Sequence, residues 1–251
     1  MQILTKQKDE KKMIQILNEI NIDNIVQKPL KDGQYYTDIV VKTQAVLHHT
    51  VSGDGIDGDL NWWNATADRI ATAIIVSRDG TINQCFKTNQ WAHHLGIKTD
   101  FLKARGFKDY QSRNVTLNKN SIGIEIDSWG GLVKHIDDKF YPALTPSTPN
   151  LKAKPIDTAN VITYPNGFRG YKYFEKYTDK QLTEIGKLLL YFGRIYSIPL
   201  TYNPDMFQVN QKALSGMPGI WSHVSYREDK SDCHPQPELI EMLKAVQNYH
   251  K

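Results

Sequence analysis

Hydrophobic positions recur at two different spacings along the chain, and each spacing predicts a different kind of element. Residues 35–50 are rich in β-branched and aromatic side chains, which favour strands. In residues 71–86, two apolar runs flank Asp79-Gly80, a pair that favours a tight hairpin turn. Residues 121–127 alternate isoleucine with glycine and acidic residues, which predicts a strand with one apolar face. These three segments are the expected strands of a sheet.

The helical spacing of apolar residues predicts three helices. Residues 7–22 carry apolar side chains at helical spacing within a charged segment, which indicates a short amphipathic helix. Thr178, followed three residues later by Gln181, forms a capping-box sequence, so we expect a helix from there to about Tyr196. Pro237 is a favourable first residue for a last helix.

Strands interleaved with helices favour a mixed α/β fold. The chain shows no internal repeat and no glycine- or serine-rich linker. We therefore expect a single domain at 35–251, with a central mixed β-sheet flanked by helices, after a helical extension at 1–34. Five of the eleven prolines fall in residues 142–170, so we expect a long irregular insertion there. This insertion is a candidate for setting substrate choice.

Composition narrows the classes of function. The 251-residue chain has a net charge of +4, which suits binding to an anionic polymer. The sequence contains no basic stripe, no helix-turn-helix and no zinc-finger spacing, so we do not expect a nucleic-acid partner. Two cysteines are too few for a disulfide framework. The chain does not open with the apolar core of a signal peptide, and no apolar run approaches the ~20 residues of a membrane span. We expect synthesis in the cytoplasm without a signal peptide, and no membrane insertion.

Histidines mark the first candidate site. His48-His49-Thr50 ends an apolar strand, where a histidine pair is costly to bury without partners or a metal. The late segment at 222–237 contains four further side chains that can bind zinc, with a lysine among them: His223, Asp232, Cys233 and His234. One ligand from an early strand and two from a late loop would build a zinc hydrolase site. The alternative is a polar surface loop with ordinary surface histidines.

Glu125 is a lone carboxylate on the otherwise apolar strand at 121–127. A carboxylate near a metal could accept a proton from water and hand it to a leaving amine. The alternative is a solvent-facing acid on a half-buried strand, and Asp127 on the same face favours that alternative.

Six short motifs together resemble a known family, in that family's order along the chain. The resemblance spans about residues 42–243, and the matching pieces are AVLHHT at 45–50, SRDGTINQ at 77–84, AHHLG at 92–96, NSIGIEI at 120–126, YTDKQ at 177–181 and SHVSYREDKSDCHP at 222–235. The family is that of zinc-dependent N-acetylmuramoyl-L-alanine amidases, which includes phage lysozyme-type amidases, cell-wall-recycling amidases and animal peptidoglycan recognition proteins.

The resemblance implies a zinc site and assigns its ligands. Zn²⁺ would be held by His48, the first histidine of the HHT motif, and by His223 of the SH motif. The third ligand would be Asp232, two residues after Lys230. The family often has proline directly after that ligand, whereas this chain has Cys233, which stays a rival ligand. Lys230 matches the family lysine that stabilises the oxyanion, because it places a cation where negative charge develops.

The resemblance also implies residues that act on the substrate. Some members use a tyrosine eight residues before the glycine of the RDG turn, where this chain has Thr72. Others carry a glutamate in the IGIE strand, and Glu125 matches it, so the chain resembles this glutamate-type branch. His94 of the AHHLG motif resembles a substrate-binding histidine. Three tryptophans are candidates for lining a glycan groove, although aromatic side chains more often belong to the core: Trp221, Trp91 and Trp129.

The function implied by the resemblance is zinc-dependent hydrolysis of the amide bond between N-acetylmuramic acid and L-alanine in bacterial peptidoglycan. We expect a phage or prophage endolysin or a virion-associated lysin, which acts on the cell wall after phage-type release. The alternatives are a peptidoglycan-binding module without activity and a cytoplasmic recycling amidase that cleaves small muropeptides. A monomer is favoured, although the sequence does not define the oligomeric state.

Overall fold

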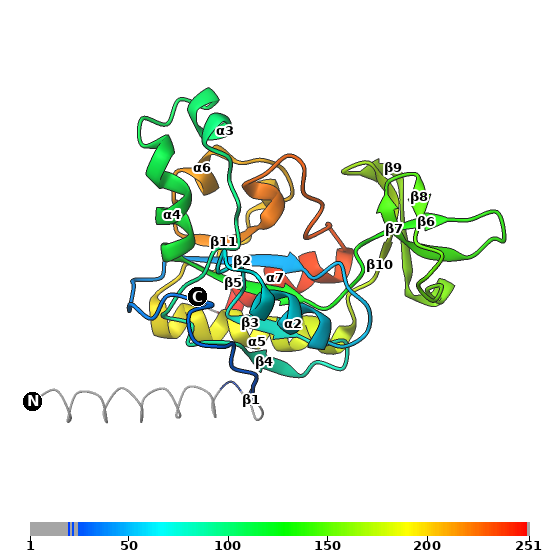
Figure 1. Cartoon of the computed structure of the whole chain (residues 1–251), viewed down its shortest axis with the longest axis horizontal. Helices are drawn as coiled ribbons and strands as arrows, with labels where there is room; N and C mark the ends of the chain where they lie inside the picture. Colours follow the sequence, from blue (N-terminus) through cyan, green and yellow to red (C-terminus); the bar gives the residue numbers. More distant parts are fainter. Residues whose placement is uncertain (1–19, 21, 23–24, 250–251) are drawn as a thin grey trace, which may run out of the picture.

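The computed structural model describes residues 20, 22 and 25–249, which fold around two β-sheets (Figure 1). The helix expected at 7–22 falls outside the described residues, apart from Ile20 and Ile22, which are buried. The elements in chain order are β1 Ile25–Gln27, β2 Gln44–His49, α2 Asp57–Ala65, β3 Ile74–Val76, β4 Ile82–Gln84, α3 Thr99–Ala104, α4 Tyr110–Asn120, β5 Ser121–Ile126, β6 Gly131–Lys134, β7 Phe140–Thr145, β8 Thr148–Pro149, β9 Val161–Phe168, β10 Tyr171–Glu175, α5 Asp179–Tyr196, α6 Gln211–Leu214, β11 Gly219–Ser222 and α7 Pro237–Tyr249, with short 3-10 helices at Thr158–Asn160, Pro204–Phe207 and His223–Ser225.

The first sheet is mixed, as expected for the α/β class. Its six strands lie in the order β1-β4-β3-β5-β2-β11. β2 is parallel to both of its neighbours, β5 and β11, and every residue of β2 is buried. A central strand that is covered on both faces has apolar side chains at consecutive positions, which explains the sequence AVL at 45–47. β3 and β4 form the predicted hairpin, with Asp79-Gly80 in the turn.

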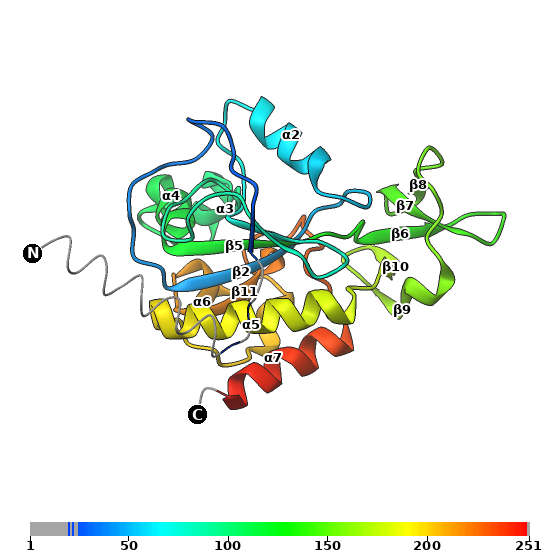
Figure 2. The same ribbon diagram turned by 90° about the horizontal axis from the view of Figure 1, so that it is seen from below.

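Two long helices cover one face of this sheet. α5 and α7 lie together on one side, and α2 lies on the other (Figure 2). The predicted capping box is present, because the Thr178 hydroxyl accepts from the Gln181 backbone N–H at 3.1 Å and the Gln181 side chain accepts from the Thr178 N–H at 2.9 Å. Gln181 also donates to the backbone oxygens of Val76, at 3.1 Å, and Asp127, at 2.8 Å. These bonds fasten the start of α5 to the ends of β3 and β5. α7 begins at Pro237, as predicted.

The expected irregular insertion at 142–170 is instead part of a second sheet. Its five strands are all antiparallel, in the order β8-β7-β6-β10-β9, and they extend from one end of the molecule (right side of Figure 1). The prolines misled the sequence interpretation because three of them lie on strands: Pro149 and Pro165 on the edge strands β8 and β9, and Pro142 on β7, between β6 and β8. An edge position tolerates the missing N–H of proline. Pro142 still takes part in the sheet through its oxygen, which accepts from the Asn150 N–H at 2.7 Å.

Two boundaries also differ from the sequence interpretation. Residues 25–27 form a strand of the first sheet, β1, which pairs parallel with β4, so this segment is not part of a helical extension. The strand expected over 35–50 begins only at Gln44, and before it Tyr36 makes an isolated bridge to Trp91. Within the part of the chain that the structure describes, no helix is both long and apolar enough to cross a membrane.

A buried ion cluster joins the two sheets. The guanidinium of Arg78 donates to both carboxylate oxygens of Glu175 at the end of β10, at 2.9 and 3.1 Å, and also pairs with Asp127 just beyond β5. Asp127 is 1% exposed, so it is not the solvent-facing acid that the alternative interpretation of this strand assumed. Removing one partner from such a cluster would leave a buried charge without compensation.

Candidate metal centre and active-site cavity

The candidate site lies where the parallel strands of the first sheet end. β2 ends with His48 and His49, and Glu125 is the register partner of His48 on β5. His223 follows directly after β11, on the other side of β2. Because the carboxyl ends of parallel strands share one edge of a sheet, residues far apart in the sequence meet there. The sequence interpretation had paired His48 with His223, and the structure brings these two together.

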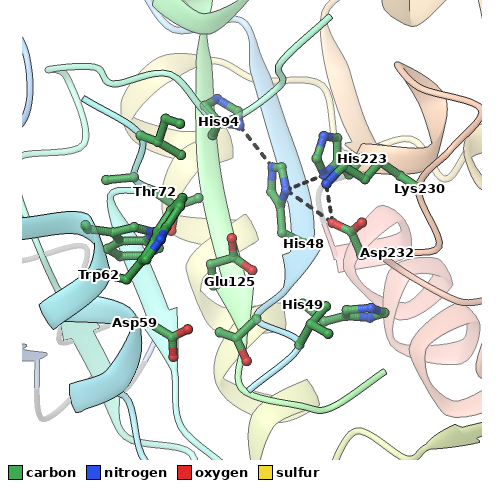
Figure 3. Close-up of a pocket in the computed structure, with 15 residues that line it drawn as sticks. His48, His49, Asp59, Trp62, Thr72, His94, Glu125, His223, Lys230 and Asp232 are labelled. Atoms are coloured by element: carbon green, nitrogen blue, oxygen red, sulfur yellow. Dashed lines mark hydrogen bonds and ion pairs between the residues drawn. The ribbon is translucent and has the colours of Figure 1, made fainter. Parts of the chain in front are cut away.

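Three side chains converge at this edge (Figure 3). Nδ1 of His48 lies 3.1 Å from Nδ1 of His223, and Oδ2 of Asp232 lies 3.3 and 2.9 Å from these two nitrogens. All three residues are buried, with exposed fractions of 2–5%. A backbone bond of 2.9 Å from Val224 N–H to the Asp232 oxygen holds the loop that carries Asp232 against His223. In the described part of the chain, these three residues form the group that can hold a metal ion.

The hydrogen bonds behind His223 determine which of its nitrogens is free. Nε2 of His223 lies 3.0 Å from the backbone oxygen of Leu95. A carbonyl oxygen can only accept, so Nε2 carries the proton and donates. In a neutral imidazole this leaves an unprotonated Nδ1, which faces His48 and Asp232.

A chain of hydrogen bonds orients His48 in the same way. The Ser121 hydroxyl donates to the Leu117 carbonyl at 2.7 Å, so it must accept from Nε2 of His94, at 2.8 Å. Nδ1 of His94 then accepts from Nε2 of His48, at 2.9 Å. Burial lowers the pKa of His94 well below its ordinary value, and burial together with His223 lowers the pKa of His48 to about 4. Both rings are therefore neutral, and Nδ1 of His48 is left unprotonated.

This arrangement fits a cation. Two imidazole nitrogens and one carboxylate oxygen meet within 3.3 Å of one another in a buried place. Converging electron pairs in a buried place repel each other unless a positive charge lies among them. Two imidazoles and a carboxylate are ligands that Zn²⁺ takes, and three protein ligands leave the fourth position open, as catalytic zinc sites require. The residues present therefore fit a zinc ion.

Cys233, the rival ligand, has a different neighbour. It is a free, fully buried cysteine whose thiol is hydrogen-bonded to the side chain of Tyr177. The Tyr177 hydroxyl lies 3.0 Å from Nδ1 of His49, so His49 also points away from the three converging atoms. His234 is fully buried and donates from Nε2 to the Glu175 oxygen at 3.1 Å. These three side chains pack behind the candidate metal centre.

A cavity of about 360 Å³ opens beside the three converging residues. Glu125 lines it, and the Oε2 atom of this carboxyl is buried without a hydrogen-bond partner among the described residues. Burial, with Asp232 and Asp59 nearby, raises the pKa of Glu125 well above its ordinary value. Lys230 lines the same cavity, so the carboxyl and the ammonium border one shared volume. A buried carboxyl with a raised pKa beside a cavity is suited to general acid–base chemistry.

Three residues expected to bind substrate have different positions. Thr72 and His94 line the cavity, although Thr72 is 1% exposed and its hydroxyl donates to the Ile74 oxygen at 3.1 Å. Trp221 does not reach the cavity: it is 2% exposed, and its Nε1 donates to the Met217 oxygen at 3.0 Å. Trp221 belongs to the core because it lies on β11, which is buried on both faces.

The sequence interpretation missed the α2 wall of the cavity. Asp59 and Trp62 line the cavity from this helix, on the side opposite Asp232 (Figure 3). The signal that could have found them is the pair Trp62-Trp63, since two adjacent tryptophans cannot both face the core of a short helix. This segment belongs to none of the six motifs that resemble the family.

The fold and the site together define a mixed α/β protein, in which the candidate metal centre lies where the parallel strands β11, β2 and β5 end. A family model for N-acetylmuramoyl-L-alanine amidases matches residues 40–237, so the chain belongs to this family, whose enzymes hydrolyse the bond between N-acetylmuramic acid and L-alanine in peptidoglycan. The family expected from the motifs is thereby confirmed. No curated protein sequence matches the chain.

Several solved structures are similar to the chain at low identity. PlyL is 12% identical, with a TM-score of 0.47, over 90% of this chain and 98% of PlyL. The endolysin amidase LysCS from Clostridium intestinale is 14% identical, with a TM-score of 0.44, over 90% of this chain and 95% of LysCS. The catalytic domain of XlyA is 13% identical, with a TM-score of 0.47, over 90% of this chain and 99% of that domain.

Proposed function

We propose that this amidase is zinc-dependent and that His48, His223 and Asp232 are its protein ligands. One observation carries the proposal: the Nδ1 atoms of His48 and His223 and the Asp232 carboxylate converge in a buried place, as the ligands of a metal ion do. The same observation favours Asp232 over Cys233 as the third ligand, because the Cys233 thiol is hydrogen-bonded to Tyr177. Retention of this complete group also argues against a binding module that has lost its activity.

Each residue around the cavity then has a role in amide hydrolysis. Zn²⁺, when bound, polarises the scissile carbonyl and lowers the pKa of water. The charge of a bound Zn²⁺ would favour the ionised form of Glu125. In that form Glu125 accepts a proton from the attacking water on its unpartnered oxygen and passes it to the departing alanine nitrogen. Lys230 places its ammonium beside the carbonyl oxygen, where negative charge develops in the transition state. His94 and Ser121 hold His48 in the tautomer that presents Nδ1 to the metal.

The proposal includes the setting in which the enzyme acts. We assign it to the cell wall as a lysin of the phage or prophage type, with polymeric peptidoglycan as its substrate. A recycling amidase would instead prefer small soluble muropeptides. The ratio of kcat/KM on whole sacculi to that on a disaccharide tripeptide separates the two roles.

Product analysis on purified peptidoglycan tests the chemistry. We expect new alanine amino termini without new reducing sugars, loss of this activity on chelation, and recovery on addition of Zn²⁺. New reducing ends would identify a glycosidase and would overturn the assignment of the site. If activity survived complete removal of metal, the proposed role of zinc would be wrong, while the amidase assignment would stand. An Asp232→Asn variant, measured beside the wild type, shows whether the recovered activity depends on the assigned ligand.

A further inference from the structure

Two adjacent tryptophans on α2 have opposite surroundings. Trp63 is 6% exposed and belongs to the hydrophobic core, whereas Trp62 is 56% exposed. Successive residues of an α-helix point about 100° apart, so anchoring Trp63 in the core turns Trp62 outward. A single exposed tryptophan is ordinary on a protein surface. Trp62 differs from an ordinary surface tryptophan because α2 holds its side chain at the cavity.

Trp62 stands at the junction of two hollows. It lines the cavity that holds Glu125, and it also lines a neighbouring groove of about 510 Å³. Both hollows share His94, His223 and Lys230, so the groove continues from the candidate metal centre past the indole. In Figure 3 the indole faces the cavity from the side opposite Asp232 and Lys230. A substrate extending from the scissile bond along this groove would pass over Trp62.

The other tryptophans do not offer such a surface. Trp91 and Trp221 are 4% and 2% exposed. Trp129 is half-buried and stands next to Gly53, where an added Cβ would lie 3.2 Å from its ring. Trp62 is therefore the tryptophan with a free aromatic face at the cavity, and it was not among those expected from the sequence.

The groove combines a flat apolar surface with hydrogen-bonding groups. Besides the indole, it is lined by the side chains of Asp68, Asn114 and Arg227, which supply both acceptors and donors. A pyranose ring matches this combination, because one face carries C–H groups and its rim carries hydroxyl and acetamido groups. The stem peptide near the scissile bond offers small side chains and carboxylates, which gain little from a flat aromatic face. We infer that Trp62 forms a glycan-binding subsite, on which a sugar ring of the peptidoglycan strand stacks.

This inference rests on the proposed function for the identity of the polymer, but its test does not require catalysis. Peptide-free strands of alternating N-acetylglucosamine and N-acetylmuramic acid are titrated into metal-free protein, and binding is followed by tryptophan fluorescence and by calorimetry. Trp62→Ala should weaken binding by about tenfold, and Trp62→Phe by about threefold or less, since an aromatic contact contributes up to ~1.5 kcal/mol. Ile136→Ala is the control: its side chain is 94% exposed in the turn between β6 and β7 and lines neither hollow, so the affinity of this variant should equal that of the wild type.

Kinetics with zinc-loaded enzyme identify the occupant. On a disaccharide peptide, Trp62→Ala should raise KM by about tenfold and change kcat by no more than about twofold, because uniform binding is lost. On a D-lactoyl peptide, which keeps the scissile amide and lacks the sugar, the variant and the wild type should agree. An equal rise in KM on both substrates would place the stem peptide on Trp62 and overturn the inference.

The two proposals fail in different ways. If the wild type cleaves peptidoglycan but Trp62→Ala binds the glycan strands as tightly as the wild type, the subsite is wrong and the amidase assignment stands. If the glycan strands bind through Trp62 but no alanine amino termini are released, the subsite stands and the proposed function is wrong. Circular dichroism of both Trp62 variants separates a loss of binding from a loss of fold.

Discussion

The two sheets differ in how their strands run, and this difference decides where reactive groups can gather. In the six-stranded sheet, β11, β2 and β5 are parallel, so His48, Glu125 and His223 meet at one edge. In the five-stranded sheet every pair is antiparallel, so the ends of neighbouring strands alternate between the two edges. The metal-binding group found among the described residues lies at the first sheet, in keeping with this topology.

The second sheet touches the site through few side chains. Arg78 and Glu175 form one link, and the Tyr164 hydroxyl, 2.8 Å from Nδ1 of His234, forms another. His234 lies two residues after Asp232, so the second link ends close to the candidate metal centre. We therefore expect changes at the first sheet to alter zinc binding and catalysis, and changes at the second sheet to alter stability. The following predictions test that division.

The largest effect is expected for Glu125→Gln. Loss of a general acid–base group lowers kcat by about 10²–10⁴-fold. Zinc content, measured by elemental analysis, should stay at the wild-type level because Glu125 is not an assigned ligand. Full activity in this variant would show that another group moves the proton.

The assigned ligand set predicts a contrast between neighbouring residues. Asp232→Asn should weaken zinc binding by more than about 100-fold, beyond the effect expected for residues that only orient a ligand. Cys233→Ser should leave zinc affinity within about threefold of the wild type, since its partner is Tyr177. Competition with a chromogenic chelator measures both affinities. The reverse ranking would make Cys233 the third ligand.

The hydrogen-bond chain behind His48 predicts a smaller effect at a distance. Ser121→Ala removes the acceptor for His94, so His48 loses its fixed tautomer, and zinc affinity should fall by about 10–100-fold. Ser112→Ala on α4 is the matched control, because the Ser112 hydroxyl donates to the Asp109 carbonyl at the exposed start of this helix. Equal zinc affinities in the two variants would show that the hydrogen bonds from Ser121 through His94 do not orient His48 for metal binding.

The raised pKa of Glu125 predicts a pH dependence in the metal-free protein. Burial lifts the folded-state pKa above the ordinary value of 4.5, so the folded protein holds a proton that the unfolded chain releases. The resulting contribution to stability is present at low pH and is lost as the pH rises above that value. The free energy of unfolding of the wild type should thus fall relative to Glu125→Gln as the pH rises. Parallel denaturation curves at each pH would contradict the raised pKa.

The smallest effect is expected at the second sheet. Tyr164→Phe removes the bond to His234 and should lower the free energy of unfolding by about 1 kcal/mol. Zinc affinity and kcat should stay at wild-type levels. Tyr141→Phe is the control within the same sheet, because its hydroxyl bonds Asp137 at the exposed surface, and its effect should be smaller. A loss of zinc affinity in Tyr164→Phe would show that the second sheet supports the metal centre directly.

Local patterns in the sequence account for much of the first sheet. The Asp79-Gly80 turn, the Thr178 capping box and the Pro237 start were all predictable, because each depends on residues within a few positions of one another. The prediction failed at 142–170, where prolines indicated a loop and the chain forms β7 to β9. Proline reports the loss of one N–H, and whether that loss matters depends on which strand lies beside it.

The sequence by itself determined the family, the candidate ligands and most elements, since motif order and hydrophobic spacing are properties of the chain alone. Only the tertiary structure decided that the Nδ1 atoms of His48 and His223, 175 positions apart, face each other with Asp232. It also decided that Trp221 is core and Trp62 is the exposed tryptophan at the cavity. The physical reason is that burial and proton positions depend on which strands pair and which helix covers them. The spacing of neighbouring residues determines neither the strand pairing nor the packing of the helices.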